Sequence, residues 1–373
     1  MKIKVLKTDL EAALQVAEIG IAGTGSDLST HYLFLYRDDV LWIMSFDRRI
    51  CAQFPLKCEV EGKDGDAFTI EGKRLNRWLG GVREEEITFE NRGDGDIAIS
   101  SQRSTIEIPS LDPSKFPVWE ESLSKASPIA TLASDRLASA LTYAKNFISD
   151  KDSTRPEISQ VEVIDGALWS TDKKAVSLIS MGDLAESSMR IHGKDVPSVT
   201  KFLGLKETDD VEILEGERNV FLRRGDGATI GASRPIASFP KLTIDRDGDD
   251  AIYWVIKKEE LTAAIQCLTA AADWESTRLR FGFNADSGEV VVAVKTLSGK
   301  DNVYPITCIE AEGTDDLPDG GFWLDYPYLQ DVINHFKGDT LRFGINSRGK
   351  GGYVRFRHLI DSDDFLTVVV WRI

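Results

Sequence analysis

A helical pattern of apolar residues occurs three times along the 373-residue chain. Each copy places apolar side chains at i, i+3, i+4, i+7 and i+11, which form one face of an amphipathic helix. The copies begin at Leu10, Leu137 and Leu261, so their offsets are 127 and 124 residues. A short strand-like run precedes each copy. Because solenoid repeats span only roughly 20–50 residues, this long period predicts three similar domains instead.

A second, shorter helix recurs later in each copy. Its apolar residues are Ile70, Leu75, Trp78 and Leu79, then Ile191, Val196, Val199 and Leu203, then Leu324, Leu329, Val332, Ile333 and Phe336. Glycine-rich turns also recur, at 92–95, 224–227 and 348–351, between alternating segments. Gly and Asp supply the positive φ of tight hairpins. Hairpin turns therefore explain these motifs better than an adhesion role for Arg-Gly-Asp does.

The order strand, helix, strands, helix, strands predicts an α+β fold. In each domain, two helices should pack on antiparallel sheets. Phe116-Pro117 and Phe239-Pro240 mark the ends of two copies. We place the domain boundaries at 1–122, 123–248 and 249–373, and we call these ranges the first, second and third repeats. Thr8 and Glu11 suggest a capping box for the first helix.

The formal net charge of −16 argues against a nucleic-acid partner unless basic residues are concentrated on one surface. Several basic residues do lie on or near the predicted helices, away from their apolar faces. As a set, they are candidate sequence-independent DNA contacts: Lys73, Arg74, Arg77, Arg83, Lys145, Lys194, Lys201, Lys206, Lys257 and Lys337. The alternative is that they form ordinary solvated helix faces. The first helix exposes Asp9, Glu11 and Glu18, so DNA contact there should be poor.

No catalytic or cofactor motif stands out. GxSxG, HExxH and Walker sequences do not occur, so we expect neither an enzyme nor a cofactor. The four histidines are scattered and suggest no zinc site. The four cysteines form no CxxC pair and are interpreted as reduced core residues. The run 245–250 resembles a calcium loop with its glycine misplaced, and an acidic linker is the better interpretation.

Several segments resemble one known family. They are Thr154-Arg155-Pro156, Asp165-Gly166 followed by Thr171-Asp172, Phe239-Pro240, and the apolar C-terminus ending in Trp371-Arg372-Ile373. In order and spacing they are similar to the β subunit of bacterial DNA polymerase III, the sliding clamp. The resemblance covers the whole chain. It implies three clamp-type domains and a head-to-tail dimer that closes a ring around duplex DNA.

The resemblance also implies partners and a location. The partners would be DNA polymerase, a clamp loader and a second copy of the chain, in the cytoplasm of a bacterium or phage-infected cell, near the nucleoid. Partner peptides would dock in a pocket between the second and third domains. The residues expected to line that pocket are Ile158, Thr171, Lys174, Val176, Pro240, Val369, Val370, Trp371, Arg372 and Ile373. The C-terminal segment can equally be a final core strand, and both roles can hold because alternate residues face opposite sides.

Two segments near this pocket depart from the family. The family usually has Gly, then His or Tyr, then Arg after Thr-Asp, whereas this chain has Lys173-Lys174-Ala175. Near its C-terminus, this chain has Val369-Val370-Trp371-Arg372, whereas the family usually has Met-Pro-Met/Val-Arg. These changes suggest a divergent clamp, for example from a phage or plasmid, with its own peptide preference. The rival hypotheses are an acidic DNA mimic and a structural assembly protein that reuses a repeated domain.

Overall fold

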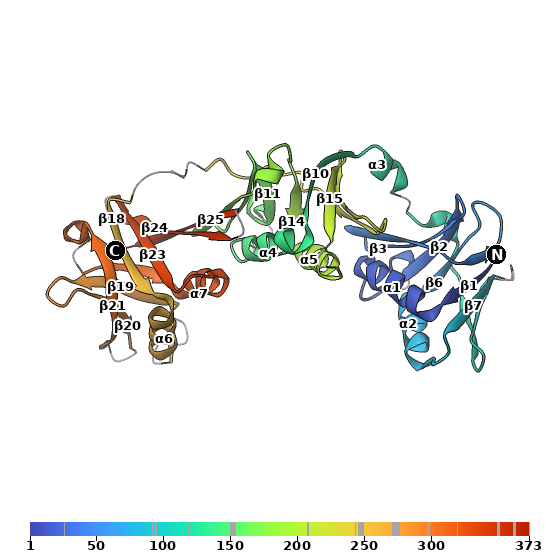
Figure 1. Cartoon of the computed structure of the whole chain (residues 1–373), viewed down its shortest axis with the longest axis horizontal. Coiled ribbons are helices and arrows are strands. Elements are labelled where there is room, and N and C mark those ends of the chain that lie inside the picture. The colour runs from blue at the N-terminus through green and yellow to red at the C-terminus, as the bar shows by residue number, and fades with distance from the viewer. Residues whose placement is uncertain are drawn as a thin grey trace. The chain divides into compact units, whose positions relative to one another are not determined.

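The structure is a computed structural model. It describes residues 1–373 except positions 26, 92, 94, 118, 150–153, 207–208, 243, 245–249, 271–276, 297–298, 319, 349–350, 361–362 and 373. The side chains at 347, 348, 351, 359, 360, 363, 371 and 372 are also not described. The chain forms two compact units, Met1–Leu141 with Glu186–Ile236, and Thr142–Ala185 with Ala237–Ile373. Figure 1 labels the helices and strands.

Each repeat has the predicted element order, which confirms the α+β class. The first repeat contains β1 (Lys2–Leu6), α1 (Lys7–Ala17), β2 (His31–Arg37), β3 (Val40–Phe46), β4 (Ile50–Leu56), β5 (Glu59–Glu61), β6 (Ala67–Glu71), α2 (Gly72–Gly81), β7 (Glu86–Asn91), β8 (Asp96–Ser100) and β9 (Thr105–Pro109). The short helix α3 (Glu120–Ser124) spans the predicted first boundary.

The second and third repeats follow the same order. The second contains β10 (Ser127–Ala133), α4 (Ser134–Lys145), β11 (Gln160–Ile164), β12 (Ala167–Thr171), β13 (Ala175–Ser180), β14 (Arg190–His192), α5 (Val196–Gly204), β15 (Asp210–Glu215), β16 (Asn219–Arg224) and β17 (Thr229–Ser233). The third contains β18 (Ile252–Lys257), α6 (Lys258–Thr269), β19 (Arg278–Asn284), β20 (Glu289–Lys295), β21 (Asp301–Glu312), β22 (Phe322–Asp325), α7 (Tyr326–His335), β23 (Thr340–Arg348), β24 (Gly351–Ile360) and β25 (Asp363–Arg372).

One backbone hydrogen bond recurs in all three repeats. The N–H of the first residue of the long helix donates to the carbonyl just before the strand that follows the shorter helix. The three bonds join Lys7 to Glu85 at 2.6 Å, Ser134 to Asp209 at 3.0 Å and Lys258 to Asp339 at 2.8 Å. The repeat seen in the sequence is therefore also a repeat of local geometry.

The unit that contains the first repeat holds two antiparallel sheets. Their strand orders are β5-β1-β7-β8-β9 and β10-β15-β16-β17-β4-β3-β2-β6. The apolar faces of α1 and α2 are buried against the sheet residues Phe34, Phe68 and Phe89. Strand β17 joins β4, with Ile230 opposite Ala52. A strand of the second repeat thus extends a sheet of the first.

The other unit contains a comparable junction. Strand β25 of the third repeat pairs with β13 of the second, with Thr367 opposite Ser177. Within the third repeat, pairing runs through β25-β22-β19-β20-β21-β18-β23-β24, and β24 pairs again with β25. Helix α6 packs against α7 (Figure 1). Both junctions add the last strand of one repeat to a sheet of the preceding repeat.

Some local predictions were wrong. The expected capping box is absent because β1 runs directly into α1, whose N-cap Leu6 has no side-chain cap. Cys267 is exposed on α6, so it is not a core residue, although Cys51 is buried and all four cysteines are free. Trp78 is only half-buried, unlike its helix neighbours Leu75 and Leu79.

The turn at 224–227 is a hairpin, as predicted. Gly227 has a φ of 86°, and the Asp226 carboxylate accepts from the N–H of Ala228 at 3.0 Å. The Arg224 side chain is buried, so the Arg-Gly-Asp sequence is not presented for adhesion. The turns at 92–95 and 348–351 and the acidic run 245–249 lie wholly or partly outside the described residues.

Candidate functional site

A tight turn between β12 and β13 forms one wall of the predicted pocket. The Thr171 hydroxyl donates to the carbonyl of Ala175 at 2.7 Å and accepts from the N–H of Lys173 at 3.0 Å. The Asp172 carboxylate accepts from the N–H groups of Lys174 and Ala175, each at 2.9 Å. These bonds hold Lys173 at a φ of 79°, a left-handed conformation that residues other than glycine rarely adopt. The wall is therefore preorganised.

A cavity of about 560 Å³ lies beside this turn, within one compact unit. Its lining is mostly apolar and comes from residues 157–158, β12, β13 and the turn between them, β24, β25 and the segment after Phe239. The lining residues are Glu157, Ile158, Thr171, Lys173, Val176, Pro240, Leu242, Ile244, Tyr353, Val368 and Val370. Its size and character suit apolar anchors of a peptide or another small ligand.

The structure brings together part of the predicted pocket set. Ile158, Thr171, Val176, Pro240 and Val370 all line the cavity. Val369 does not: it is buried opposite Ala175, on the other face of β25. Lys174 lines an adjacent recess instead. The side chains of Trp371 and Arg372, and all of Ile373, lie outside the described residues.

Sequence reasoning missed several lining residues. Strand alternation could have identified Val368 with Val370, because alternate residues share a face. No sequence signal indicated Tyr353, which reaches the cavity because β24 pairs with β25, with Tyr353 opposite Val370. Leu242 and Ile244 lie between Phe239-Pro240 and the acidic run 245–250, in a segment for which no sequence motif indicated a role.

A smaller, charged recess of about 80 Å³ adjoins the cavity, and Lys173 and Val370 line both. Its other lining residues are Lys174, Arg278, Trp323 and Asp325. The Asp325 carboxylate lies 3.6 Å from the Lys174 ammonium and 3.4 Å from the Arg278 guanidinium. Lys173 has no ion-pair partner among the described residues. The recess is thus lined by three cations and one carboxylate, which two of the cations share.

Tyr328 links the turn to α7. Its hydroxyl donates a hydrogen bond to the second oxygen of the Asp172 carboxylate. Burial raises the pKa of Tyr328, and the Asp172 carboxylate raises it further. Tyr328 therefore stays protonated and donates to Asp172. This contact fixes a pocket wall from the second repeat against a helix of the third.

The first repeat contains an equivalent turn. Arg48 has a φ of 80°, and the Asp47 carboxylate accepts from the N–H groups of Arg49 and Ile50 at 2.9 and 2.6 Å. Here both cations have carboxylate partners within the chain. Arg48 lies 2.8 Å from Asp27, and Arg49 lies 3.1 Å from the buried Asp195.

Helix α2 carries the clearest group of exposed cations among the predicted DNA contacts. Lys73, Arg74 and Arg77 are all exposed. Lys73 donates to the carbonyl of Gly23 at 2.5 Å, and Arg74 pairs with Glu71 at 2.7 Å. Arg77 has no ion-pair partner within the described part of the chain. The helix has no acidic residue of its own, so its exposed surface is locally positive.

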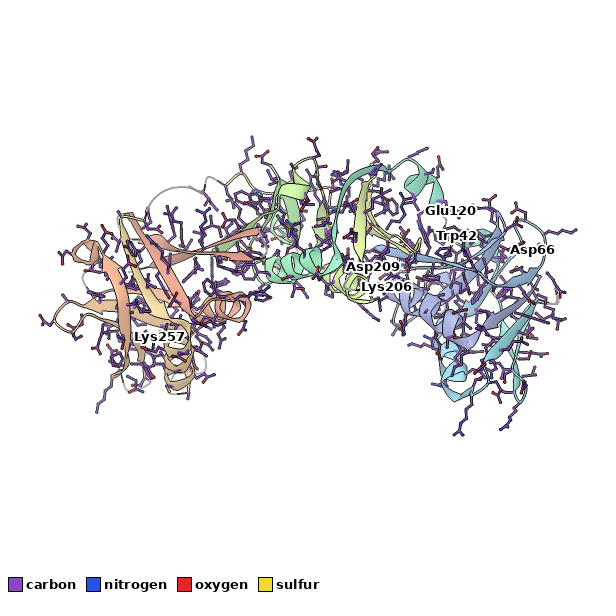
Figure 2. The ribbon with its side chains drawn as sticks, in the orientation of Figure 1. Trp42, Asp66, Glu120, Lys206, Asp209 and Lys257 are labelled. Atoms are coloured by element: carbon purple, nitrogen blue, oxygen red, sulfur yellow. The ribbon has the colours of Figure 1, made fainter. Side chains whose placement is uncertain are left out.

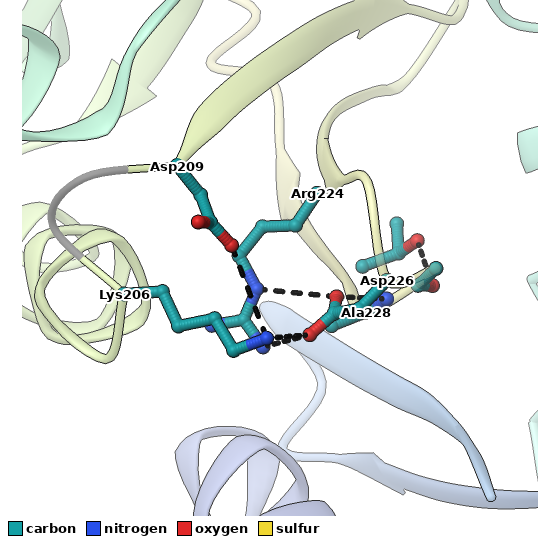
Figure 3. A network of polar contacts seen from close by, with 7 residues as sticks. Lys206, Asp209, Arg224, Asp226 and Ala228 are labelled. Atoms are coloured by element: carbon teal, nitrogen blue, oxygen red, sulfur yellow. Dashed lines mark hydrogen bonds and ion pairs between the residues drawn. The ribbon is translucent and has the colours of Figure 1, made fainter.

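Other predicted contacts are paired with carboxylates. Lys206 lies 2.9 Å from Asp226 and 3.9 Å from Asp209, in a network that includes the buried Arg224 (Figure 3). Lys201 lies 3.8 Å from Glu18. Lys257, at the junction of β18 and α6 (Figure 2), lies 3.9 Å from Glu259.

The remaining predicted contacts lie outside the α2 surface. Arg83 follows α2, Lys194 precedes α5, and Lys337 follows α7; all three are exposed. Lys145 ends α4 and is half-buried. Across the described residues, no cluster of His, Cys, Asp or Glu could hold a metal ion. No described helix is both long and apolar enough to cross a membrane.

Comparisons with known proteins connect the fold to one group of structures. No protein-family model and no curated protein sequence matches the chain. The DNA polymerase III subunit beta from Pseudomonas aeruginosa superposes with a TM-score of 0.83 at 16% identity, over 100% of both chains. The DNA polymerase sliding clamp from Caulobacter crescentus gives 0.84 at 15%, also over 100% of both. That from Bacillus subtilis gives 0.83 at 15%, over 100% of this chain and 99% of the other.

These similarities extend from one end of the chain to the other, at 15–17% identity. They agree with the antiparallel sheets and the repeated pair of helices. The chain therefore has, over its whole length, the fold of the bacterial DNA polymerase III beta sliding clamps, with a strongly diverged sequence.

Proposed function

We propose that the chain is a DNA sliding clamp, a non-catalytic ring that encircles duplex DNA and tethers a DNA polymerase as a processivity factor. Its three clamp domains would be 1–122, 123–248 and 249–373. The whole-chain fold supports this proposal. The observation that carries it is that the second and third repeats each add their last strand to a sheet of the repeat before.

The strand junctions leave two edges for a second chain. Strand β4 receives β17, and β13 receives β25. The corresponding strand of the third repeat is β21, and within the described structure only its second half, from Cys308, pairs with β18. Strand β9, the last of the first repeat, pairs only with β8 there. Pairing β9 of one chain with the first half of β21 of another would repeat the junction.

Such a contact is heterologous, because two different surfaces meet, and it forms a ring only if the rotation closes. Two chains would then contribute six domains. Closure would remove edge strands that otherwise favour uncontrolled association. The proposed assembly is thus a homodimer, opened by a clamp loader to admit DNA.

The charge distribution suits a protein that slides. Phosphate contacts carry no sequence information, and few of them bind weakly and in a salt-dependent way. The exposed cations of α2 supply such contacts, while the net charge of −16 opposes adhesion to DNA elsewhere. Retention would come from ring closure in the cytoplasm of a bacterium or phage-infected cell. The cavity beside Thr171 would hold a peptide of the polymerase or another partner.

The first test is the solution mass, measured by light scattering on a sizing column. We expect twice 41.4 kDa. The dimer, assembled with a loader, should remain on closed circular DNA and slide off the same DNA after it is cut. A DNA mimic would bind a DNA-binding protein instead, and a structural protein would form other assemblies. A stable monomer that is never retained on circular DNA would contradict the proposal.

A further inference from the structure

The two equivalent turns differ in one respect that bears on ligand binding. Each holds a basic residue in the left-handed region, Arg48 at φ 80° and Lys173 at φ 79°. Each is fixed by an aspartate that accepts two backbone N–H groups. The carboxylate of Asp27 neutralises Arg48. Lys173 has no such carboxylate among the described residues.

The surroundings of Lys173 do not supply the missing charge. Asp325 is the acidic residue of the recess, and it already faces Lys174 and Arg278 and accepts from the Thr277 hydroxyl at 2.9 Å. The second oxygen of Asp172 is occupied by Tyr328. The recess lined by three cations and one carboxylate therefore keeps an excess of positive charge.

Lys173 is also placed where a ligand would meet it. It lines both the 560 Å³ apolar cavity and the 80 Å³ charged recess. A side chain other than glycine in the left-handed region is a strained choice, and such strain often occurs at functional sites. The larger cavity has Glu157 among its lining residues, so the two parts of the site differ in charge.

We propose that Lys173 binds a carboxylate of the docked partner, so that this pocket selects a peptide with an acidic side chain next to its apolar anchors. The partner's carboxylate would neutralise Lys173, as Asp27 neutralises Arg48 within the chain. This inference rests on the proposed function of the cavity as a peptide site. It adds the charge of the partner segment, which the apolar lining alone does not specify.

The test uses blocked synthetic peptides in matched pairs, with binding to the full-length protein followed by fluorescence anisotropy. Every peptide has two large apolar side chains, and a pair carries Glu or Gln at one of the three positions before them. In at least one pair, we expect the Glu peptide to bind about three- to fivefold more tightly at low salt, as for a partly exposed ion pair. The preference should shrink as salt is raised.

The variant Lys173→Gly removes the ammonium and leaves a residue that tolerates the local φ, so folding is not at risk. It should abolish the Glu preference, so that the Glu and Gln peptides of each pair bind this variant with equal affinity. Arg48→Gly, in the equivalent turn, is the matched control and should leave both affinities unchanged. Equal binding of Glu and Gln peptides in all pairs would overturn the role of Lys173 while the pocket stands. Binding of no peptide would overturn the pocket and this inference together.

Discussion

His358 is a polar side chain held in an apolar environment. The residue is 8% exposed, and neither ring nitrogen has a hydrogen-bond partner in the described structure. The rings of Phe336 and Phe365 lie 4.8 and 5.0 Å from it, and that of Tyr143 lies 6.1 Å away. Burial, together with the charge of the nearby His335, lowers the pKa of His358 to about 4.

This pKa predicts a loss of stability in mild acid. Between about pH 6.5 and pH 4 the unfolded chain binds a proton at His358 that the folded chain does not, so unfolding becomes easier as pH falls through this window. The full effect is about 3 kcal/mol below the folded pKa. We expect His358→Phe to lose less stability than the wild type between pH 7 and pH 5 in urea titrations. Identical pH dependence would contradict this account.

At the scale of elements, the strand junction depends on close contact between β17 and β4. A Cβ atom on Gly231 would lie 2.6 Å from the Cys51 sulfur and 2.6 Å from the Phe221 ring. Gly80, on α2, would meet nothing within 4 Å. The two glycines thus form a matched pair: close packing requires a glycine at 231, whereas no neighbouring atom of the described structure prevents a side chain at 80.

Replacing these glycines should have opposite effects. Gly231→Val should lower the free energy of unfolding by about 1–3 kcal/mol, because overpacking forces neighbouring atoms to move. Gly80→Ala should raise it by up to about 1 kcal/mol, because alanine favours the helix. Thermal unfolding followed by circular dichroism measures both changes. A Gly231→Val protein as stable as the wild type would show that β17 can shift away from β4.

Helix α2 carries the exposed cations that we propose contact DNA. Arg77→Ala should weaken DNA binding and flatten its salt dependence, by roughly 0.9 in the log–log slope for each phosphate that the variant no longer neutralises. Lys206→Ala is the control, since Asp226 and Asp209 already neutralise Lys206, and it should leave the slope nearly unchanged. Binding titrations over a salt series give both slopes. Equal changes would mean that ion pairing does not separate DNA-binding cations from solvated ones.

At the scale of the whole molecule, assembly should depend on the first half of β21, which in the described structure pairs with β20 on one side but not with β18 on the other. Val303 lies there with 53% of its surface exposed, and Ile236 lies outside any strand with 98% exposed. Both are large apolar side chains in water, so they differ mainly in location.

Val303→Asp should shift the mass measured by light scattering from dimer towards monomer. A charge would have to be desolvated at the proposed junction with β9, at an unfavourable cost in free energy. Ile236→Asp should leave the mass unchanged. If both variants stay dimeric at low protein concentration, the dimer closes through another surface.

The sequence by itself determined the threefold repeat, the order of helices and strands, and the buried faces of the helices. These follow from local periodicity, because residues three and four apart share a helix face whatever the rest of the chain does. Leu10, Leu75 and Val199 were predicted to be buried for this reason, and all three are buried.

Only the tertiary structure decided which strands join the repeats, which cations are neutralised and which residues line the cavity. Lys206 meets Asp226 because two hairpin strands return beside α5, and Tyr353 reaches the cavity because β24 pairs with β25. The same is true of Arg48, which Asp27 neutralises, and Lys173, which no described carboxylate does. Such contacts depend on pairing between distant segments, which periodicity within one segment does not encode.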